Sequence, residues 1–147
     1  MNDVDREIDL KPYLAAMTAT DPRKRAAAVA FAKVELPTAA LAALAGQLAE
    51  GYQRVSSPAV RDATGASLSE LGEPAVRPVL RAIHRSRRDA VRLRLVLLLC
   101  ELKTAIPIFE RLGVADSLAA VEDQTACDRL KAACGLARTI LIEDELT

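Results

Sequence analysis

The chain has 147 residues, of which 51% are hydrophobic, so it suits one globular domain covering 1–147 and is too apolar for a disordered chain. Aromatic residues make up only 3% and tryptophan is absent, so a core has to be built from Ala, Leu and Val, which favour packed helices over a sheet. Twenty basic residues balance twenty acidic ones, which argues against a uniformly basic protein that coats nucleic acid.

The start of the chain and its longest apolar run bear on where the protein works. Residues 1–14 are acidic and include no long apolar stretch, so no signal peptide is expected. The run from Leu95 to Cys100 is far short of the roughly 20 residues that cross a membrane. We therefore expect a cytoplasmic protein with short acidic tails at about 1–7 and 143–147 and no contact with a membrane.

Apolar residues spaced three and four apart predict eight helices. The predicted ranges are 8–18, 22–35, 38–54, 58–71, 74–85, 88–102, 104–121 and 125–142. Pro22, Pro58 and Pro74 each fall in a first helical turn, where the missing N–H costs nothing, and Asp21 and Ser57 precede two of them as N-caps. The segment 104–121 contains a proline and a glycine, so it is predicted as one helix or two short ones.

Helices joined by links this short favour antiparallel hairpins, and the hairpins are similar to one another. One arginine marks the same position in successive second helices, at Arg25, Arg61, Arg92 and Arg129, with separations of 36, 31 and 37 residues. The residues three, four and seven positions after each arginine are small or apolar and fall on one helical face. The sequence therefore predicts a degenerate repeat of helical hairpins.

Three stretches open predicted second helices in a similar way: Asp21-Pro-Arg-Lys-Arg25, Ser57-Pro-Ala-Val-Arg61 and Asp89-Ala-Val-Arg92. Together with Gly72–Ile83, which is similar to a first helix, they resemble the HEAT-repeat family, especially the shorter bacterial HEAT-like repeats of phycobilisome lyases. The resemblance covers about 20–140, and the unit that begins at Thr125-Ala-Cys-Asp-Arg129 departs from it most. It implies an all-α fold, an α-solenoid or armadillo-like superhelix of about four helical hairpins, in a bacterial protein that scaffolds or recognises other macromolecules.

The repeated arginines have a structural interpretation. A planar, permanently charged guanidinium group bonds the carbonyls or carboxylates of a neighbouring loop while its aliphatic stem packs between units. We expect this role for Arg25, Arg61 and Arg92. The helix around 91–102 is apolar almost all round, which predicts a place at the centre of the stack.

Residues that carry catalysis or bind metal are sparse. His84 is the only histidine, and we expect it to be solvated at the end of a basic helix. The three cysteines lack metal-ligand spacing and are expected to be reduced core residues, and the glycines occur singly rather than in a phosphate-cradling loop. We therefore expect no catalytic residue, no metal and no cofactor. A HEAT-like chromophore lyase is a remote alternative that the resemblance alone supports.

The most unusual feature of the sequence is a run of arginines, which we name the arginine cluster. Its members are Arg77, Arg81, Arg85, Arg87, Arg88 and Arg94. Together with Arg92, and against the single acid Asp89, they give residues 77–94 a net charge of +6, so the rest of the chain carries −6. Three members recur every four residues and share one helical face, where like charges are mildly destabilising.

Three interpretations of the arginine cluster stay open. It is a solvated face, it pairs internally with Glu70, Glu73 and Glu101, or it binds a partner. Arginine without lysine suits bidentate contact with carboxylate or phosphate, so an acidic protein is the preferred partner and nucleic acid the alternative. No aromatic residue interleaves the cluster, which disfavours base stacking. We predict a non-catalytic interaction or scaffold module that binds a protein.

The last predicted helix ends in a run of large apolar residues. Ile140 is expected to pack inward with Leu136, whereas Leu141 and Ile142 point about 100° apart. At least one of these two is then expected to reach an outer face and to support self-association or the docking of a partner. The alternative is that the segment 104–121 covers this end.

Overall fold

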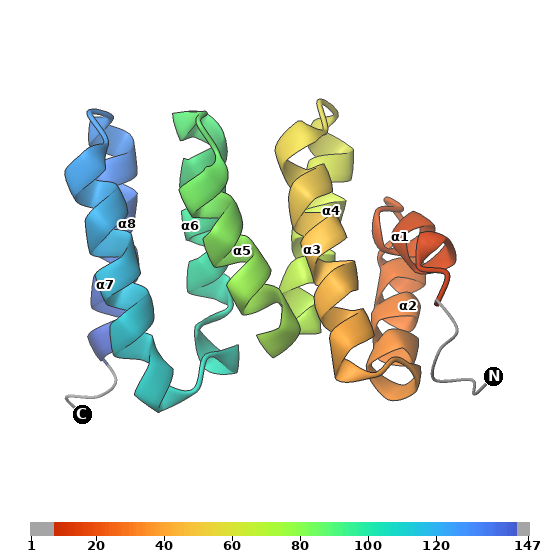
Figure 1. Ribbon diagram of the computed structural model, residues 1–147. Coiled ribbons are helices and arrows are strands. Elements are labelled where there is room, and N and C mark those ends of the chain that lie inside the picture. Colours follow the sequence, from red (N-terminus) through yellow and green to blue (C-terminus); the bar gives the residue numbers. More distant parts are fainter. Residues whose placement is uncertain (1–7, 144–147) are drawn as a thin grey trace. The chain divides into compact units, whose positions relative to one another are not determined.

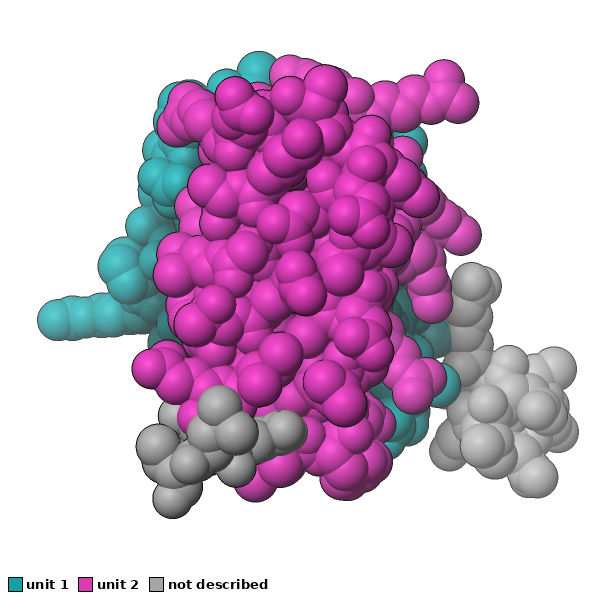
Figure 2. All heavy atoms as spheres, turned by 90° about the vertical axis from the view of Figure 1, so that its left-hand side faces the viewer, with its two compact units in different colours: residues 1–71 teal, residues 72–147 magenta. Residues whose placement is uncertain are grey.

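The computed structural model describes residues 8–143, and all regular secondary structure in that range is helical. The all-α class is therefore confirmed. The predicted acidic tails, about 1–7 and 143–147, lie outside the described residues except for Glu143. The helices labelled in Figure 1 fall into two compact units, residues 1–71 and residues 72–147 (Figure 2).

Unit 1 is built from two helical hairpins. Its helices are α1 (Lys11–Met17), α2 (Pro22–Glu35), α3 (Thr38–Arg54) and α4 (Pro58–Leu71). Helix α1 packs on α2 and α3 packs on α4, and the hairpins meet where α2 lies against α4 and α1 against α3. The predicted caps are present, because the Asp21 carboxylate accepts a 3.0 Å hydrogen bond from the Arg23 N–H and Ser57 Oγ accepts one of 3.4 Å from the Val60 N–H.

Close packing inside unit 1 depends on small residues of α4. Ser67 Oγ donates a buried 2.6 Å hydrogen bond to the carbonyl of Met17 and so ties α4 to α1. A Cβ atom at Gly65 would lie 3.2 Å from the ring of Tyr52, so the absence of a side chain lets that ring of α3 approach α4. Small side chains at these points are what allow helices with an Ala- and Leu-rich core to pack tightly.

Unit 2 also holds two hairpins. Its elements are α5 (Glu73–Arg85), α6 (Asp89–Glu101), the 3₁₀ turn η2 (Lys103–Ala105), α7 (Ile108–Gln124) and α8 (Asp128–Glu143). Helix α5 packs on α6, α7 packs on α8, and α6 lies against α8. In Figure 1, α5 and α7 form the front layer of unit 2, with α6 and α8 behind. Within this unit α6 has neighbours on two sides, as its apolar sequence predicts, and it buries Leu95 and Leu99 completely.

Two contacts fix the register of the front layer of unit 2. A Cβ atom at Gly72, just before α5, would lie 3.7 Å from Cβ of Ala105, just before α7. Near the other end, Nε2 of His84 and Oγ of Ser117 are hydrogen-bonded. Residues 72 and 105 are 33 apart in sequence, and so are residues 84 and 117. Helices α5 and α7 therefore run in the same direction, with His84 of α5 beside Ser117 of α7.

The segment predicted as 104–121 folds as a short turn followed by one long helix. Pro107 follows η2, and α7 begins directly after it and continues through Gly113, so the two-helix alternative is wrong. Arg111 holds this junction, since its buried Nε donates a 3.1 Å hydrogen bond to the carbonyl of Ile106. Residues 104–107 lack α-helical geometry because the proline cannot donate to a preceding turn.

The C-terminal helix differs from its prediction. Leu141 is fully buried, Ile142 is half-buried, and Leu136, which was expected to pack inward, is 53% exposed. The reason is the helical period: Cys134, Ala137 and Leu141 are spaced by three and four residues, so they form one stripe that α8 turns toward its neighbours, and Leu136 lies off it. Leu141 is therefore covered and not available for docking, since α7 packs along this helix, whereas docking or self-association through the half-buried Ile142 stays a prediction.

Candidate functional site

The arginines that recur in the sequence hold the hairpins together. In unit 1, Nη1 of Arg25 donates hydrogen bonds of 3.0 Å to the carbonyls of Ala19 and Thr20 in the link before α2. Nη2 of Arg61 donates one of 3.3 Å to the carbonyl of Val55 in the link before α4. Both helices thus use an arginine in their first turns to satisfy carbonyl groups where the chain reverses, as predicted.

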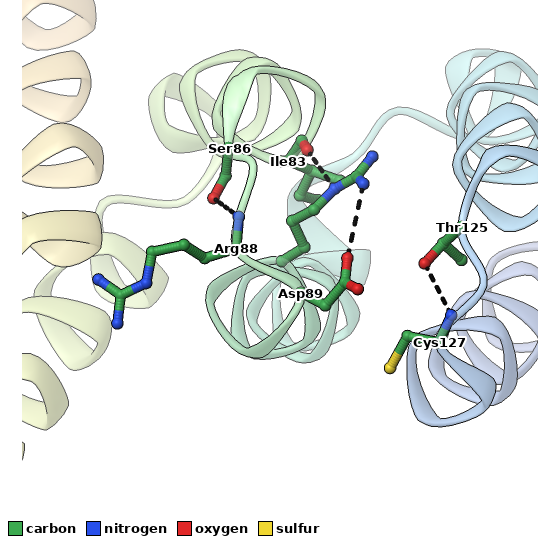
Figure 3. Close-up of polar contacts among 7 residues, drawn as sticks. Ile83, Ser86, Arg88, Asp89, Thr125 and Cys127 are labelled. Carbon is green, nitrogen blue, oxygen red and sulfur yellow. Dashed lines mark hydrogen bonds and ion pairs between the residues drawn. The ribbon is translucent and has the colours of Figure 1, made fainter.

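Arg92 has the same role in unit 2. Its Nε donates a 3.0 Å hydrogen bond to the carbonyl of Ile83 in the last turn of α5, and its Nη1 lies 3.8 Å from Oδ1 of Asp89 (Figure 3). The guanidinium group therefore joins the start of α6 to the end of α5. The predicted structural role of the three arginines is confirmed by these contacts.

The last hairpin is held differently. Arg129 is exposed, and its side chain makes no hydrogen bond or ion pair with any residue from 8 to 143. The hydroxyl of Thr125 instead accepts a 3.1 Å hydrogen bond from the Cys127 N–H ahead of α8 (Figure 3), and Arg138 pairs with Glu122 of α7 at 2.8 Å. This agrees with the departure of this unit from the sequence repeat.

The arginine cluster lies entirely within unit 2, and all six of its side chains are exposed. They come from α5 (Arg77, Arg81 and Arg85), from the link after α5 (Arg87 and Arg88) and from α6 (Arg94). The structure brings the three α5 members together on the face opposite the buried Val79, at intervals of about 6 Å along the helix. Arg94 stands apart from them on the exposed stripe of α6 that also carries Leu97.

None of the six guanidinium groups has a partner in the described part of the chain. No hydrogen bond or ion pair joins any of them to a described residue of unit 2, so pairing with Glu73 and Glu101 does not occur there, whereas Glu70 belongs to unit 1. The one polar contact in the link is made by the main chain, where the Arg88 N–H donates a 3.3 Å hydrogen bond to Ser86 Oγ (Figure 3). The cluster is therefore free to contact another molecule.

The charges of the cluster oppose one another on α5. Like charges four residues apart destabilise a helix by about 0.2 to 0.5 kcal/mol per pair, and Arg77, Arg81 and Arg85 form two such pairs. Only Arg85, in the last turn, interacts favourably with the helix dipole. The row of three is thus not explained by the stability of α5.

Sequence reasoning missed a second exposed feature of unit 2, which we name the apolar patch. It consists of Ile108, Phe109 and Leu112 on the first turns of α7, with exposed fractions of 64%, 84% and 54%. These residues lie off the stripe that α7 buries through Val114 and Leu118. Their position directly after Pro107 could have predicted this exposure, because the first turn of a helix that follows a link has fewer neighbours to cover it.

Unit 1 carries an apolar groove between α1 and α2, with a volume of about 590 Å³. The rings of Tyr13 and Phe31 stack there with their centroids 6.3 Å apart, and Lys24 is the charged residue of its lining. Apart from this lysine, the groove offers few groups that would select one ligand over another. The arginine cluster is the more specific surface.

The cysteines are placed for packing. Burial, reinforced by the negative charge of Glu122, raises the pKa of the Cys134 thiol to about 11, and burial also raises the pKa of Cys100. A thiol with a raised pKa is a poor nucleophile at neutral pH. Between residues 8 and 143 there is no group of three or more side chains arranged to hold a metal ion, and no helix there is long and apolar enough to cross a membrane.

The fold and the surface define a class: an all-α protein of two compact helical units, one of which exposes both unpaired arginines and large apolar side chains. Comparisons with protein-family models, with curated proteins and with solved structures give no significant match. Its function is therefore argued from the charges, the exposure and the contacts of its own residues.

Proposed function

We propose that this chain is a HEAT-like interaction module that binds an acidic protein partner through the arginine cluster. The observation that carries the proposal is that six exposed guanidinium groups within residues 77–94 have no partner in the described chain. Carboxylates of a partner would form charge-assisted hydrogen bonds with them and would also relieve the repulsion along α5. Binding, rather than catalysis, is the activity that such a surface supports.

The HEAT-like part of the proposal rests on the resemblance and on the recurring arginine contact. Helices α2, α4 and α6 each use an arginine near the start to bond a carbonyl of the preceding segment, at Arg25, Arg61 and Arg92. A repeated contact of this kind supports a solenoid of about four hairpins, since each copy would secure the reversal of its own hairpin. The bacterial and cytoplasmic setting comes from the resemblance and from the sequence.

Charge alone gives this surface weak affinity. An exposed ion pair contributes about 0.2 to 1 kcal/mol, whereas association costs at least roughly 4 kcal/mol of translational and rotational freedom. Six such pairs would therefore give a short-lived complex that weakens as salt screens the charges. We expect the cluster to select an acidic partner and to speed its approach, while other contacts set how long it stays.

Nucleic acid is the second candidate, because the guanidinium fork also matches phosphate. Helices α5 and α6 carry no Phe, Tyr or Trp on which a base could stack. Contact with nucleic acid would then be made to phosphates, and it would be insensitive to sequence and steeply dependent on salt.

The test compares two probes on two charge-reversed variants. The probes are a helical peptide of Glu and Ala and a mixed-sequence DNA duplex, each titrated into the protein and followed by amide NMR shifts, which detect weak binding. We expect the peptide to shift amides of α5 and of the link after it, and to lose binding when Arg77, Arg81 and Arg85 are changed together to Glu.

The matched control changes Arg23, Arg129 and Lys131 to Glu, three exposed residues outside the cluster, and keeps binding within about twofold. Tighter binding of the duplex than of the peptide at the same salt would favour nucleic acid instead.

A further inference from the structure

Arg77, Arg81 and Arg85 are named here the arginine row of α5. We propose that this row and the apolar patch of α7 form one docking surface, and that its occupant is an acidic amphipathic helix of a protein partner. This inference rests on the proposed function and specifies the chemistry of the partner. A helix with large apolar side chains on one stripe and carboxylates on the next would satisfy both parts of the surface at once. The arginine row alone or the apolar patch alone would not select such a helix.

The register of the front layer places the two features at the same height. The hydrogen bond between His84 and Ser117 places these two residues side by side, and from there α5 and α7 run back toward their first turns in the same direction. Arg77, seven residues before His84, therefore lies level with Glu110, which directly follows Phe109 of the apolar patch. Arg81 and Arg85 continue from there along α5, about 6 Å apart.

The arginine row and Phe109 also face the same side of unit 2. Helix α5 turns its buried residues toward α6, and α7 turns its buried residues toward α8, while α6 and α8 pack on each other as the back layer (Figure 1). The arginine row and Phe109 lie on the faces that these helices turn away from that layer, whereas Ile108 and Leu112 lie farther round α7, on the side away from α5. The arginine row and Phe109 consequently border a single surface, and Leu112 and Ile108 lie toward its outer edge.

The charges on that surface fix how a partner helix would lie. Carboxylates at every fourth position of a helix repeat at about 6 Å, which matches the spacing of Arg77, Arg81 and Arg85. The exposed charged residues of α7, Asp116 and Asp123, are both acidic, so the acidic side of a partner is repelled from α7 and directed to α5. Its apolar side then falls on α7, where Phe109 is the most exposed large apolar residue.

The apolar patch supplies what the arginines lack. Contacts of exposed arginines are screened by salt, whereas burial of a large aromatic side chain against another apolar surface is not, and such side chains carry much of the affinity at interfaces. The patch is too small to hold a partner by itself, and an acidic partner without apolar residues would leave it uncovered. The two features together therefore define one kind of partner.

The experiment uses four helical peptides of about 16 residues. Each has one charged stripe, made of Glu or of Lys, and one second stripe, made of Leu or of Ala, so that the four peptides cover all combinations. Binding of each labelled peptide to the full chain is measured by fluorescence anisotropy at two salt concentrations. We expect the Glu and Leu peptide to bind at least about tenfold more tightly than any other, since it alone meets both features. Phe109→Ser should reduce its affinity by about tenfold, to the level of the Glu and Ala peptide. The matched control is Val34→Ser on α2, which removes a side chain that is 80% exposed in unit 1 and should have no effect.

Each remaining outcome decides against the inference in a different way. Equal binding of the two Glu peptides, unchanged by Phe109→Ser, would overturn the docking surface and leave the arginine cluster as an acid-binding site. Failure of both Glu peptides to bind, with binding of DNA, would overturn the proposed function as well. Sedimentation that shows a dimer in the native chain and a monomer in Phe109→Ser would identify a second copy as the occupant and so overturn the acidic helix. Thermal unfolding of both serine variants confirms that each is folded.

Discussion

Arg92 and Arg94 are two residues apart on α6, yet they have different surroundings. The guanidinium group of Arg92 is bonded to the carbonyl of Ile83 at 3.0 Å, whereas that of Arg94 is exposed and has no partner among the described residues. The same side chain thus serves as an internal bond in one place and as part of a surface in the other. The difference lies in whether the helix turns that position toward a carbonyl that needs a donor.

This contrast gives a prediction for stability. Arg92→Ala should lower the free energy of unfolding by about 1 to 2 kcal/mol, because it removes a charge-assisted hydrogen bond and leaves a carbonyl without its donor. Arg94→Ala should change it by less than about 0.5 kcal/mol, as expected for an exposed residue without contacts. Urea unfolding followed by circular dichroism measures both values. Equal losses in the two variants would contradict the structural role of Arg92.

At the scale of elements, the start of α5 depends on one backbone conformation. Gly72 has φ 75° and ψ −130°, a combination that residues with a side chain adopt only under strain, and it directly precedes the helix that carries the arginine row. This glycine forms the residue before the first turn of α5 and gives it this left-handed start. Gly113, by contrast, lies inside α7, and a Cβ atom there would have no other atom within 4 Å.

We therefore expect alanine to have opposite effects at these two glycines. Gly72→Ala should destabilise the protein by about 1 to 3 kcal/mol through backbone strain, since its Cβ would meet Ala105 only at ordinary contact distance. Gly113→Ala should stabilise it by about 0.5 to 1 kcal/mol by raising helix propensity. Thermal unfolding of the two variants provides the comparison. A neutral Gly72→Ala would mean that the link before α5 rearranges without cost.

For the molecule as a whole, the arginine row should be dispensable for folding. Changing Arg77, Arg81 and Arg85 to Glu takes the net charge from 0 to −6, but these side chains are exposed and unpaired within the described chain. We expect the same helical circular dichroism signal and a free energy of unfolding within about 1 kcal/mol of the native value. Loss of structure in this variant would show that the row is held by internal pairs and is not a binding surface.

The sequence by itself determined the helical class and most helix bounds. Local signals were sufficient, because proline in a first turn, a capping Asp or Ser and a period near 3.6 act within a few residues of where they stand. The predicted ranges 22–35, 38–54 and 58–71 coincide with α2, α3 and α4. The structural role of Arg25, Arg61 and Arg92 was equally accessible, since a repeated residue at a repeated position implies a repeated contact.

Only the tertiary structure decided which apolar residues are exposed and which charged residues are unpaired. Periodicity gives the faces of a helix but does not say which neighbour covers each face, so Leu136 was expected to pack inward and is exposed, while Phe109 was overlooked and is exposed. The lateral register of α5 and α7 is likewise absent from any local pattern. It is set by the contact between His84 and Ser117, 33 residues apart in sequence, and it alone places Arg77 level with Glu110, next to Phe109.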